Sequence, residues 1–371
     1  MFSIKNIVIN SIKRPTLSLL SSRMSATSPE AKKMKIASNT IGTHSGTFHC
    51  DEVLAVFMLR NHPEFKSHGL LRSRDQSLLD QCDIVVDVGA VYDPSKKRYD
   101  HHQSTFQETF SSIRSDFGDK FGNIRLSSAG LVYVHYGEKI VTEVLKQFDT
   151  TLTDNQLKSV FSKIYSGFIQ EIDAIDNGVP QFDGEPKYRV NSHLSSRVKS
   201  FNPDWMDDKT PQEIDEAFEE AVKYVGNEFI EKIKFFALSW LPARKIVEEA
   251  VQNRLNVHES GSIIELHRFC PWQEHLRDIE KDHGNVEIKF VIFNGGGRDN
   301  DFRVQAVPVE QGSFVCRKFI NKKWFGLRDE ELEKVSGIKG GKFVHATGFI
   351  GGNHTRDGAL EMAIKSLVDD E

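Results

Sequence analysis

Asp100, His101 and His102 place three side chains that can bind a metal ion in one row. Neutral imidazole and carboxylate together suit first-row divalent ions such as Mn²⁺, Fe²⁺, Co²⁺ and Zn²⁺. An isolated Asp-His-His also occurs by chance on protein surfaces, so the tripeptide by itself does not indicate a metal centre. Its interpretation depends on the other acids and histidines of the chain.

Three further segments carry the same chemistry, each at the end of an expected helix or strand. A loop after residue 43 holds two histidines and an acid, an apolar strand at 84–86 ends in an acid, and two acids close a long helical pattern. These side chains are His44, His49, Asp51, Asp87, Asp173 and Asp176. Open α/β sheets bind ligands outside the carboxyl ends of their strands, so such positions are where a site is expected.

The two acids at the helix end add a physical reason to expect a cation. A capping-box pattern at Thr153 begins a helix that the pair Asn177-Gly178 ends. Asp173 and Asp176 are three residues apart, so they project from one face of the last turn. A helix C-terminus is electronegative, and carboxylates there are unfavourable without a cation. Two solvated acids at a helix end are the alternative interpretation.

The elements around these side chains alternate as in an α/β domain. Residues 40–43 are expected to form a strand, 50–60 a helix packed on a sheet, and 83–87 a β-branched strand buried on both faces. A helix is expected over 126–136. Its N-terminus at Ser127-Ser128 offers free backbone N–H groups that could hold a phosphate.

Two irregular segments interrupt this pattern. Residues 104–122 are polar and rich in Phe without a clear period, which predicts a mobile loop beside the site. Residues 178–210 are rich in Pro, Ser and Asp, which predicts a linker and a hinge. Thr210, Pro211 and Glu213 then carry the cap signals of a long helix, whose apolar stripe is expected to belong to the core.

Strand patterns follow the long helix and predict a second domain. They cover residues 262–266, 286–294 and 302–307. The glycine-rich stretch 294–299 joins the last two, either as a hairpin turn or as a phosphate-binding turn. Near the end of the chain, a glycine-bearing turn precedes a helix expected over 357–368. Backbone N–H groups at such a helix N-terminus form a plausible cradle for phosphate.

Composition limits the classes of function. The 371 residues have room for two domains. A net charge of −5 argues against a protein that coats nucleic acid, although it is compatible with a local basic channel. The four cysteines include no CxxC pair, which favours a reducing compartment, and Cys50 is expected to be a small buried residue.

The first 36 residues differ in composition from the rest. They are basic, rich in Ser and nearly free of acids, which is typical of a mitochondrial transit peptide. There are two alternatives: a weak nuclear localisation signal around Lys32-Lys33, and a disordered tail without a targeting signal. No apolar run is long enough for a membrane span, so no membrane insertion is expected.

Five longer stretches resemble a known family. GTHSGTFHCDEVLA, DVGAVYDPSKKRYDHHQ, SSAGLVY, EIDAIDNG and FIGGNHTRDGALEMA are similar to the melanocyte-proliferating-gene-1 family, and the Asp-His-His motif resembles the DHH phosphoesterase superfamily. The resemblance covers residues 40 to 368. It implies an α/β fold in which a DHH-type parallel-sheet domain is followed by a smaller α+β domain. We accordingly expect a disordered targeting tail at 1–36, a metal-binding domain at 37–178, a linker and long connecting helix at 179–255, and a substrate-binding domain at 256–371.

The resemblance also implies an activity. It points to a 3′→5′ exoribonuclease that hydrolyses single-stranded RNA with two divalent ions, acting in the mitochondrial matrix and in the nucleus or nucleolus. Mn²⁺ is the first expectation and Mg²⁺ the alternative, because His49 stands where most DHH proteins carry Asp, and a softer ion suits imidazole. A hydrolase of small phosphates and a non-catalytic RNA-binding protein are the competing hypotheses. The oligomeric state is left open.

Roles follow from the same resemblance. His44, His49 and Asp87 would hold one ion; Asp51, Asp87, His101 and one of Asp173 or Asp176 would hold the other, with Asp87 as the bridge. Asp100, His101 and His102 would be catalytic, with Asp100 orienting His101 or another ligand and His102 facing the phosphate. The expected substrate-binding residues are Arg303, Gly351, Gly352, His354 and Arg356. In the second domain, aromatic and basic side chains are expected either to stack and bind RNA or to belong to ordinary core and surface.

Overall fold

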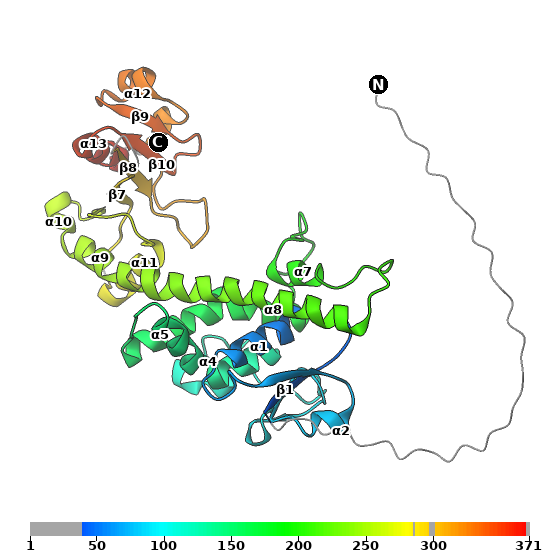
Figure 1. The fold of residues 1–371 in the computed structure, drawn as a ribbon. Coiled ribbons are helices and arrows are strands. Elements are labelled where there is room, and N and C mark those ends of the chain that lie inside the picture. Colours follow the sequence, from blue (N-terminus) through cyan, green and yellow to red (C-terminus); the bar gives the residue numbers. More distant parts are fainter. Residues whose placement is uncertain (1–38, 285, 297–300, 369–371) are drawn as a thin grey trace, which may run out of the picture. The chain divides into compact units, whose positions relative to one another are not determined.

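A computed structural model describes residues 39–368 except 285 and 297–300 (Figure 1). Its first sheet holds five strands. The strand order is β2-β1-β3-β5-β4. The strands are β1 (Thr40–Thr43), β2 (Gly69–Arg72), β3 (Ile84–Val86), β4 (Tyr92–Asp93) and β5 (Arg98–Tyr99). All neighbours pair in parallel except β4 and β5. The buried side chains of β3 fit the expected parallel strand covered on both faces.

Helices of the first half pack on this sheet and on one another. They are α1 (Cys50–Arg60), α2 (Gln76–Leu79), α3 (Phe110–Ile113), α4 (Ser128–Lys146), α5 (Asp154–Ile164) and α6 (Gln170–Asp176), with η1 (Pro94–Lys96), η2 (Ser115–Phe117) and the π-helical η3 (Tyr165–Ile169). The helix expected from Thr153 to Asp176 is confirmed as the continuous run of α5, η3 and α6, and its predicted capping box is present.

The segment expected to be a mobile loop is anchored in the core. Phe106, Phe110 and Phe121 are buried, and the Phe110 ring lies 4.3 Å from the Tyr165 ring, centroid to centroid. The Phe side chains show no single helical or strand period because they reach the core from turns and from the short helix α3. The expectation of a mobile loop at 104–122 is therefore wrong where these aromatic side chains anchor the segment.

A long helical run connects the two sheets. It consists of α8 (Pro211–Lys234), the π-helical η4 (Phe235–Trp240) and α9 (Leu241–Gln252), followed by α10 (Arg254–Val257). The predicted capping box between Thr210 and Glu213 is present, and Phe218, Val225 and Phe229 of the expected apolar stripe are buried. Before this run, the predicted linker contains the short helix α7 (Leu194–Lys199), which contacts α1, α6 and α8.

The second sheet also has five strands, in the order β6-β7-β8-β10-β9. They are β6 (Ile263–Leu266), β7 (Phe290–Asn294), β8 (Phe302–Ala306), β9 (Gly341–Val344) and β10 (Ile350–Asn353), accompanied by α11 (Gln273–His283), η5 (Lys322–Trp324), α12 (Asp329–Ser336) and α13 (Arg356–Leu367). Only β6 and β7 pair in parallel. The predicted fold class, an α/β chain with two domains, is confirmed.

Some sequence-based expectations lie outside the described residues. These are the tail at 1–36 and positions 297–299 of the glycine-rich stretch. Among the helices that the structure describes, none combines the length and the apolar character needed to cross a membrane. All four cysteines are free and buried, as expected for Cys50.

Candidate metal centre

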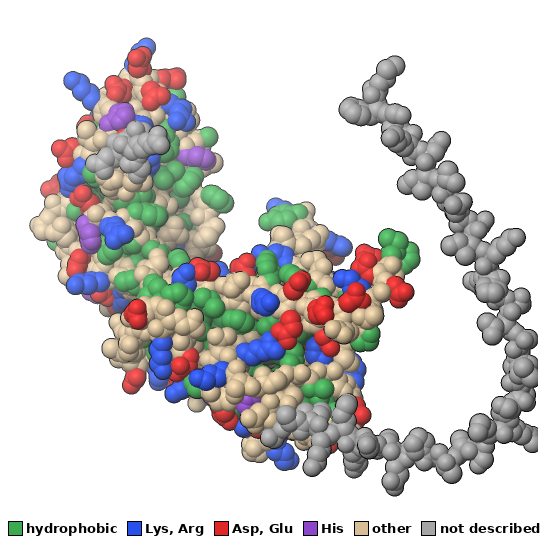
Figure 2. Space-filling view, viewed as in Figure 1, with side chains coloured by type: hydrophobic (Ala, Val, Ile, Leu, Met, Phe, Trp, Pro, Cys, Tyr) green, Lys and Arg blue, Asp and Glu red, His purple; other side chains and the backbone are tan. Residues whose placement is uncertain are grey.

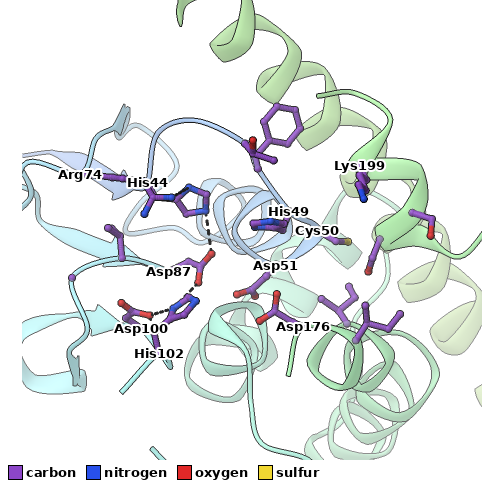
Figure 3. Close-up of a pocket in the computed structure, with 18 of the residues that line it drawn as sticks. His44, His49, Cys50, Asp51, Arg74, Asp87, Asp100, His102, Asp176 and Lys199 are labelled. Carbon is purple, nitrogen blue, oxygen red and sulfur yellow. Dashed lines mark hydrogen bonds and ion pairs between the residues drawn. The ribbon is translucent and has the colours of Figure 1, made fainter. Parts of the chain in front are cut away.

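A pocket of about 780 Å³ lies at the carboxyl ends of the parallel strands of the first sheet (Figure 3). β1, β3 and β5 each end one residue before a polar side chain that lines it, namely His44, Asp87 and Asp100. Parallel strands end at the same edge of a sheet, so side chains far apart in sequence meet there. Other walls come from α1, α6 and α7 and from the loops that carry His49, Arg74 and Ala90.

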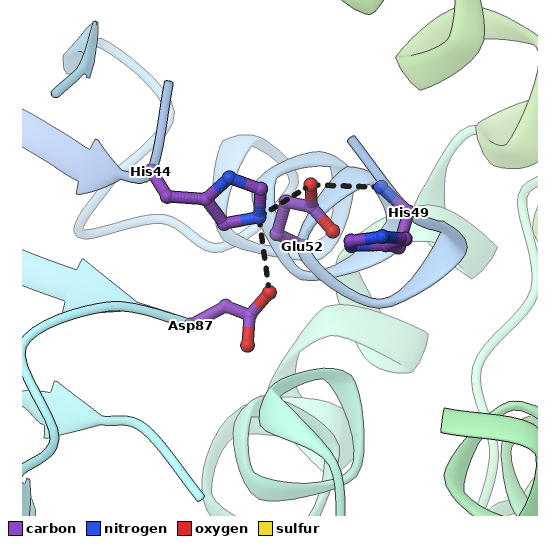
Figure 4. A group of neighbouring side chains, drawn as sticks. All are labelled: His44, His49, Glu52 and Asp87. Carbon is purple, nitrogen blue, oxygen red and sulfur yellow. Dashed lines mark hydrogen bonds and ion pairs between the residues drawn. The ribbon is translucent and has the colours of Figure 1, made fainter. Parts of the chain in front are cut away.

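One group of candidate ligands gathers around His44 (Figure 4). His44, His49, Glu52 and Asp87 each offer an atom within 4.8 Å of the others. The Nε2 atom of His44 lies 2.9 Å from Glu52 Oε1 and 3.4 Å from Asp87 Oδ2. His49, His44 and Asp87 were expected together, and the structure adds Glu52. The spacing of His49 and Glu52 was the available signal, since residues three apart share one face of a helix.

A second group gathers around His101. Its Nε2 atom lies 3.0 Å from Asp176 Oδ2, 3.5 Å from Asp87 Oδ1 and 3.7 Å from Asp51 Oδ2. The ligand atoms of Asp51, His101 and Asp176 lie within 4.8 Å of one another, as do those of Asp87, His101 and His102. Asp87 thus faces His44 with one oxygen and His101 with the other.

The backbone at Asp87 is in an unusual conformation. Asp87 has φ 55° and Ala90 has φ 53°, in the left-handed region that non-glycine residues rarely adopt. Such a conformation costs on the order of 1–3 kcal/mol and persists only where the surroundings enforce it. The turn directs the Asp87 carboxylate back toward the end of β1, where it lies between the two histidines.

Asp51 and Asp173 are held by the N-terminus of α4. The Asp51 carboxylate accepts hydrogen bonds from the backbone N–H groups of Ser128 (2.9 Å) and Ala129, and from Ser127 Oγ (2.7 Å). Asp173 accepts from Ser127 N (3.0 Å). These carboxylates occupy donors that were expected to be free for a phosphate, so that expectation is wrong.

The structure separates the two acids at the end of α6. Asp176 belongs to the group around His101. Asp173 instead accepts hydrogen bonds from Ser127 and from Tyr165 Oη (3.0 Å), and burial raises the pKa of its carboxyl to about 7. Asp173 therefore positions α6 against α4, while Asp176 faces the pocket.

Asp100 contacts His102 rather than His101. Its Oδ1 lies 2.6 Å from His102 Nδ1, and its Oδ2 accepts the Ala90 N–H at 2.6 Å. The hydrogen bond to Asp100 raises the pKa of His102 against the opposing effect of burial. The side chain of His102 is 61% exposed and lines the pocket, so its Nε2 is free to meet a substrate.

Electrostatics show how strongly the site favours positive charge. Burial disfavours a charged His44, but Asp87 and Glu52 outweigh it and raise its pKa to about 10. Burial likewise opposes charge on His101, whose pKa Asp176 and Asp87 raise to about 11. The clustered carboxylates thus favour positive charge between them, and a divalent ion would supply that charge.

The residues present fit a divalent cation. Glu52 Oε2 is buried without a hydrogen-bond partner, although an unpaired buried polar atom costs about 1–3 kcal/mol. Glu52 belongs to the candidate ligand group around His44, and a bound ion would satisfy this oxygen. Imidazole nitrogen with carboxylate oxygen is a donor set that Mn²⁺ and related ions accept.

The expected substrate-binding residues of the second domain lie outside this pocket. Arg356 pairs with Glu265 at 2.6 Å, and His354 Nδ1 lies 3.1 Å from Asp301 Oδ1. Arg303 lies over the Phe343 ring, 5.4 Å from its centroid. Gly351 and Gly352 form part of strand β10 rather than a turn, so the expectation of a glycine turn there is wrong. A Cβ atom on Gly352 would lie 2.8 Å from Phe343, which explains the glycine.

Asn202 positions the loop that carries His49. It accepts the Phe48 N–H at 2.9 Å and donates to the Phe48 carbonyl oxygen at 2.8 Å, one residue before His49. Arg72 supports the same loop by donating to the Gly46 carbonyl oxygen at 2.7 Å. No sequence pattern linked these residues to the site, because 154 positions separate Asn202 from Phe48.

Asn202→Asp is expected to weaken metal binding. The new carboxylate oxygen would face the Phe48 carbonyl oxygen, which removes a hydrogen bond and adds repulsion worth about 1–3 kcal/mol. Supports of this kind typically change metal affinity by about 10- to 100-fold. Titration calorimetry with Mn²⁺ measures the change. Asn61→Asp is the matched control, because Asn61 Nδ2 donates to the Phe57 carbonyl oxygen outside the pocket. Equal Mn²⁺ affinity in Asn202→Asp and the wild type would contradict this role.

Comparison with known proteins identifies the relatives of this chain. Residues 40–367 match the family designated MYG1_exonuc, described as an uncharacterised protein family (UPF0160). The chain is 45% identical to the human MYG1 exonuclease over 344 residues, covering 92% of this chain and 89% of the relative. It is 46% identical to the rat MYG1 exonuclease, covering 88% and 84%, and 44% identical to the MYG1 protein of Dictyostelium discoideum, covering 88% and 96%. No solved structure matches this chain.

The family match spans nearly all described residues, and it includes every element that contributes to the pocket. At this identity and coverage, the relationship extends over the whole fold. The chain therefore belongs to the MYG1 exonuclease family.

Proposed function

We propose that this chain is a metal-dependent nuclease that hydrolyses the phosphodiester bonds of single-stranded RNA from the 3′ end. The observation that carries the proposal is the Asp87 carboxylate, whose two oxygens face two separate groups of candidate ligands. A shared carboxylate between neighbouring ions is the arrangement of two-metal phosphoesterases. The mammalian relatives bear the name exonuclease, which supports this class of reaction.

In this proposal the two groups hold one ion each. His44, His49, Glu52 and Asp87 would hold the first, and Asp51, Asp87, His101 and Asp176 the second. Two divalent ions so held would lower the pKa of a bound water and neutralise charge on the phosphate. Mn²⁺ is the ion that we propose first, because three histidines belong to the set.

The side chains of the protein contribute positioning and proton transfer. His102 presents Nε2 to the pocket while Asp100 holds Nδ1, so the imidazole is oriented to donate a proton to a phosphate or leaving-group oxygen. Arg74 lies with its Nη2 atom 3.2 Å from His44 Nδ1 and lines the same pocket. It offers a fixed positive charge to the phosphate. Sequence reasoning did not single out Arg74.

The pocket volume supports action at a chain end. About 780 Å³ is the size of a site for one small ligand, so it would hold a terminal nucleotide and its phosphate rather than a length of strand. The same volume favours a second candidate, a hydrolase of small phosphates such as pyrophosphate or short oligonucleotides. A non-catalytic RNA-binding protein is a weaker candidate, since it would have no need of the shared carboxylate.

We also propose that the protein acts in mitochondria and the nucleus. The support is the basic, Ser-rich and acid-poor composition of residues 1–36. Expression of the full chain with a C-terminal fluorescent tag, beside a form that begins at Met34, tests this proposal. Loss of the mitochondrial signal in the shorter form is expected, and an unchanged distribution would contradict a targeting role.

Hydrolysis of a single-stranded RNA labelled at its 5′ end tests the activity. With Mn²⁺, we expect a ladder of products that shortens from the 3′ end, and a chelator should abolish it because the proposed attacking water is activated by the bound ions. The double variant Asp100→Ala/His101→Ala should show no ladder. Intact RNA together with metal-dependent release of phosphate from pyrophosphate would favour the small-phosphate hydrolase. Intact RNA without phosphate release would contradict both enzymes.

A further inference from the structure

The segment 179–206 exposes large apolar side chains beside the pocket. Of the 17 large hydrophobic residues that are exposed in the described part of the chain, seven lie between residues 175 and 206. Trp205 is 90% exposed and Tyr188 is 77% exposed. Figure 2 shows hydrophobic atoms at the surface of the two loops that flank α7. Single exposed apolar residues are normal, but a concentration of this kind marks an interaction surface.

We propose that Tyr188 and Trp205 form a stacking platform for the bases of a single-stranded nucleic acid whose terminal phosphate lies in the pocket. This inference rests on the proposed function and specifies how the strand is held. Aromatic faces bind bases with little regard to sequence, because every base has a flat π-surface. The platform would lie on the segment that was expected to be a linker, and not on the second domain.

The segment is continuous with the pocket wall. His193, Ser195, Ser196 and Lys199 all line the pocket. Five positions separate Tyr188 from His193, so the two Cα atoms lie at most about 18 Å apart. A strand that leaves the pocket would therefore meet Tyr188 within a few nucleotides.

The other aromatic side chain is tied to the candidate metal centre. Trp205 follows Asn202 by three positions, and Asn202 forms two hydrogen bonds with Phe48, which lines the pocket. Asn202 therefore links the segment that carries Trp205 to the loop that carries His49. Lys199 lies across the pocket from Arg74 in Figure 3, so cationic side chains flank the pocket on two sides.

The segment carries both cationic and acidic side chains. Lys187, Arg189 and Lys199 form no ion pair with any residue that the structure describes. Asp204 and Asp207 accept backbone N–H groups of their own loop, at 3.4 Å and 2.9 Å. Asp183 and Glu185 lie in the same segment, so it has no large excess of positive charge. Stacking rather than long-range attraction must therefore supply most of the binding.

The test compares RNA binding and length preference in the full-length protein. Tyr188→Ala/Trp205→Ala is expected to bind a 12-nucleotide single-stranded RNA roughly 10- to 100-fold more weakly, measured by fluorescence anisotropy. The ratio of kcat/KM for that RNA to kcat/KM for a dinucleotide should fall in proportion. Tyr188→Phe/Trp205→Phe retains the aromatic faces and should restore both. Phe314→Ala is the matched control, because Phe314 is 76% exposed in the second domain.

The outcomes separate this proposal from the proposed function. Unchanged RNA affinity and length preference in Tyr188→Ala/Trp205→Ala would overturn the platform, even if the wild type is an active nuclease. If RNA binding depends on Tyr188 and Trp205 but the wild type does not hydrolyse RNA, the nuclease proposal is overturned and the platform is supported. If the wild type self-associates and the double variant is monomeric with unchanged RNA affinity, the surface binds a second copy of the chain and the platform is overturned.

Discussion

Asp87→Asn is expected to remove RNA hydrolysis and to weaken metal binding in both candidate groups. The substitution preserves the volume of the side chain but removes its negative charge, and one oxygen becomes an amide nitrogen that cannot bind a cation. Because one oxygen of Asp87 faces His44 and the other faces His101, both candidate ligand groups lose a ligand. Mutation of a residue that only supports the ligands typically lowers metal affinity or activity about 10- to 100-fold. Mutation of a shared ligand should therefore lower kcat/KM more than ~100-fold.

Measurement of Mn²⁺ binding and of RNA hydrolysis on the same preparations checks this prediction. Asp83→Asn is the matched control, because Asp83 lies at the other end of β3 and pairs with His68 and Lys97. Its partly exposed ion pairs contribute about 0–1 kcal/mol to stability, so folding and metal affinity should be nearly unchanged. Retention of at least half the wild-type activity in Asp87→Asn would rule out Asp87 as the shared ligand.

Gly130→Ala is expected to destabilise the fold and to disturb the site together. Gly130 lies in the first turn of α4, and a Cβ atom there would lie 2.7 Å from Asp173 Oδ2 and 2.8 Å from its Cγ. Asp173 is fully buried and accepts hydrogen bonds from Ser127 and Tyr165, so it cannot move away without losing them. Overpacking of this kind costs about 1–3 kcal/mol, more than the ~1 kcal/mol that Ala gains in helix propensity.

Urea unfolding monitored by circular dichroism measures the free energy of unfolding, and Mn²⁺ titration reports on the site. The same turn of α4 holds Asp51 through Ser127, Ser128 and Ala129, so a shift of the turn should also lower metal affinity. Gly69→Ala is the control, since Gly69 has no atom within 4 Å of the added Cβ. Equal stability of Gly130→Ala and the wild type would show that Asp173 and α4 separate freely, contrary to the packing described.

The sequence by itself determined the local elements and most of the candidate ligands. β1, α1 and the capped helices beginning at Thr153 and Thr210 follow from periodicity and capping, which act between residues a few positions apart. His44 and Asp87 were recognisable because each directly follows an expected strand, and Asp100 because it begins the Asp-His-His tripeptide. Such signals need no knowledge of distant contacts.

Only the tertiary structure decided which of these side chains meet. Asp173 and Asp176 are both aspartates on the same helix face. Asp173 nevertheless accepts a hydrogen bond from the N-terminus of α4, while Asp176 faces His101. Glu52 was not among the predicted ligands, and the tertiary fold places its Oε1 atom 2.9 Å from His44 Nε2.

Contacts across the chain also decided the roles of the irregular segments. Aromatic residues of 104–122 pack against α5 and η3. Part of the predicted linker at 178–210 forms a wall of the pocket, through His193, Ser195, Ser196 and Lys199. The physical reason is the same in each case. Hydrogen bonds and apolar contacts between residues tens to more than a hundred positions apart determine these arrangements, and no local pattern of residue types encodes the partner.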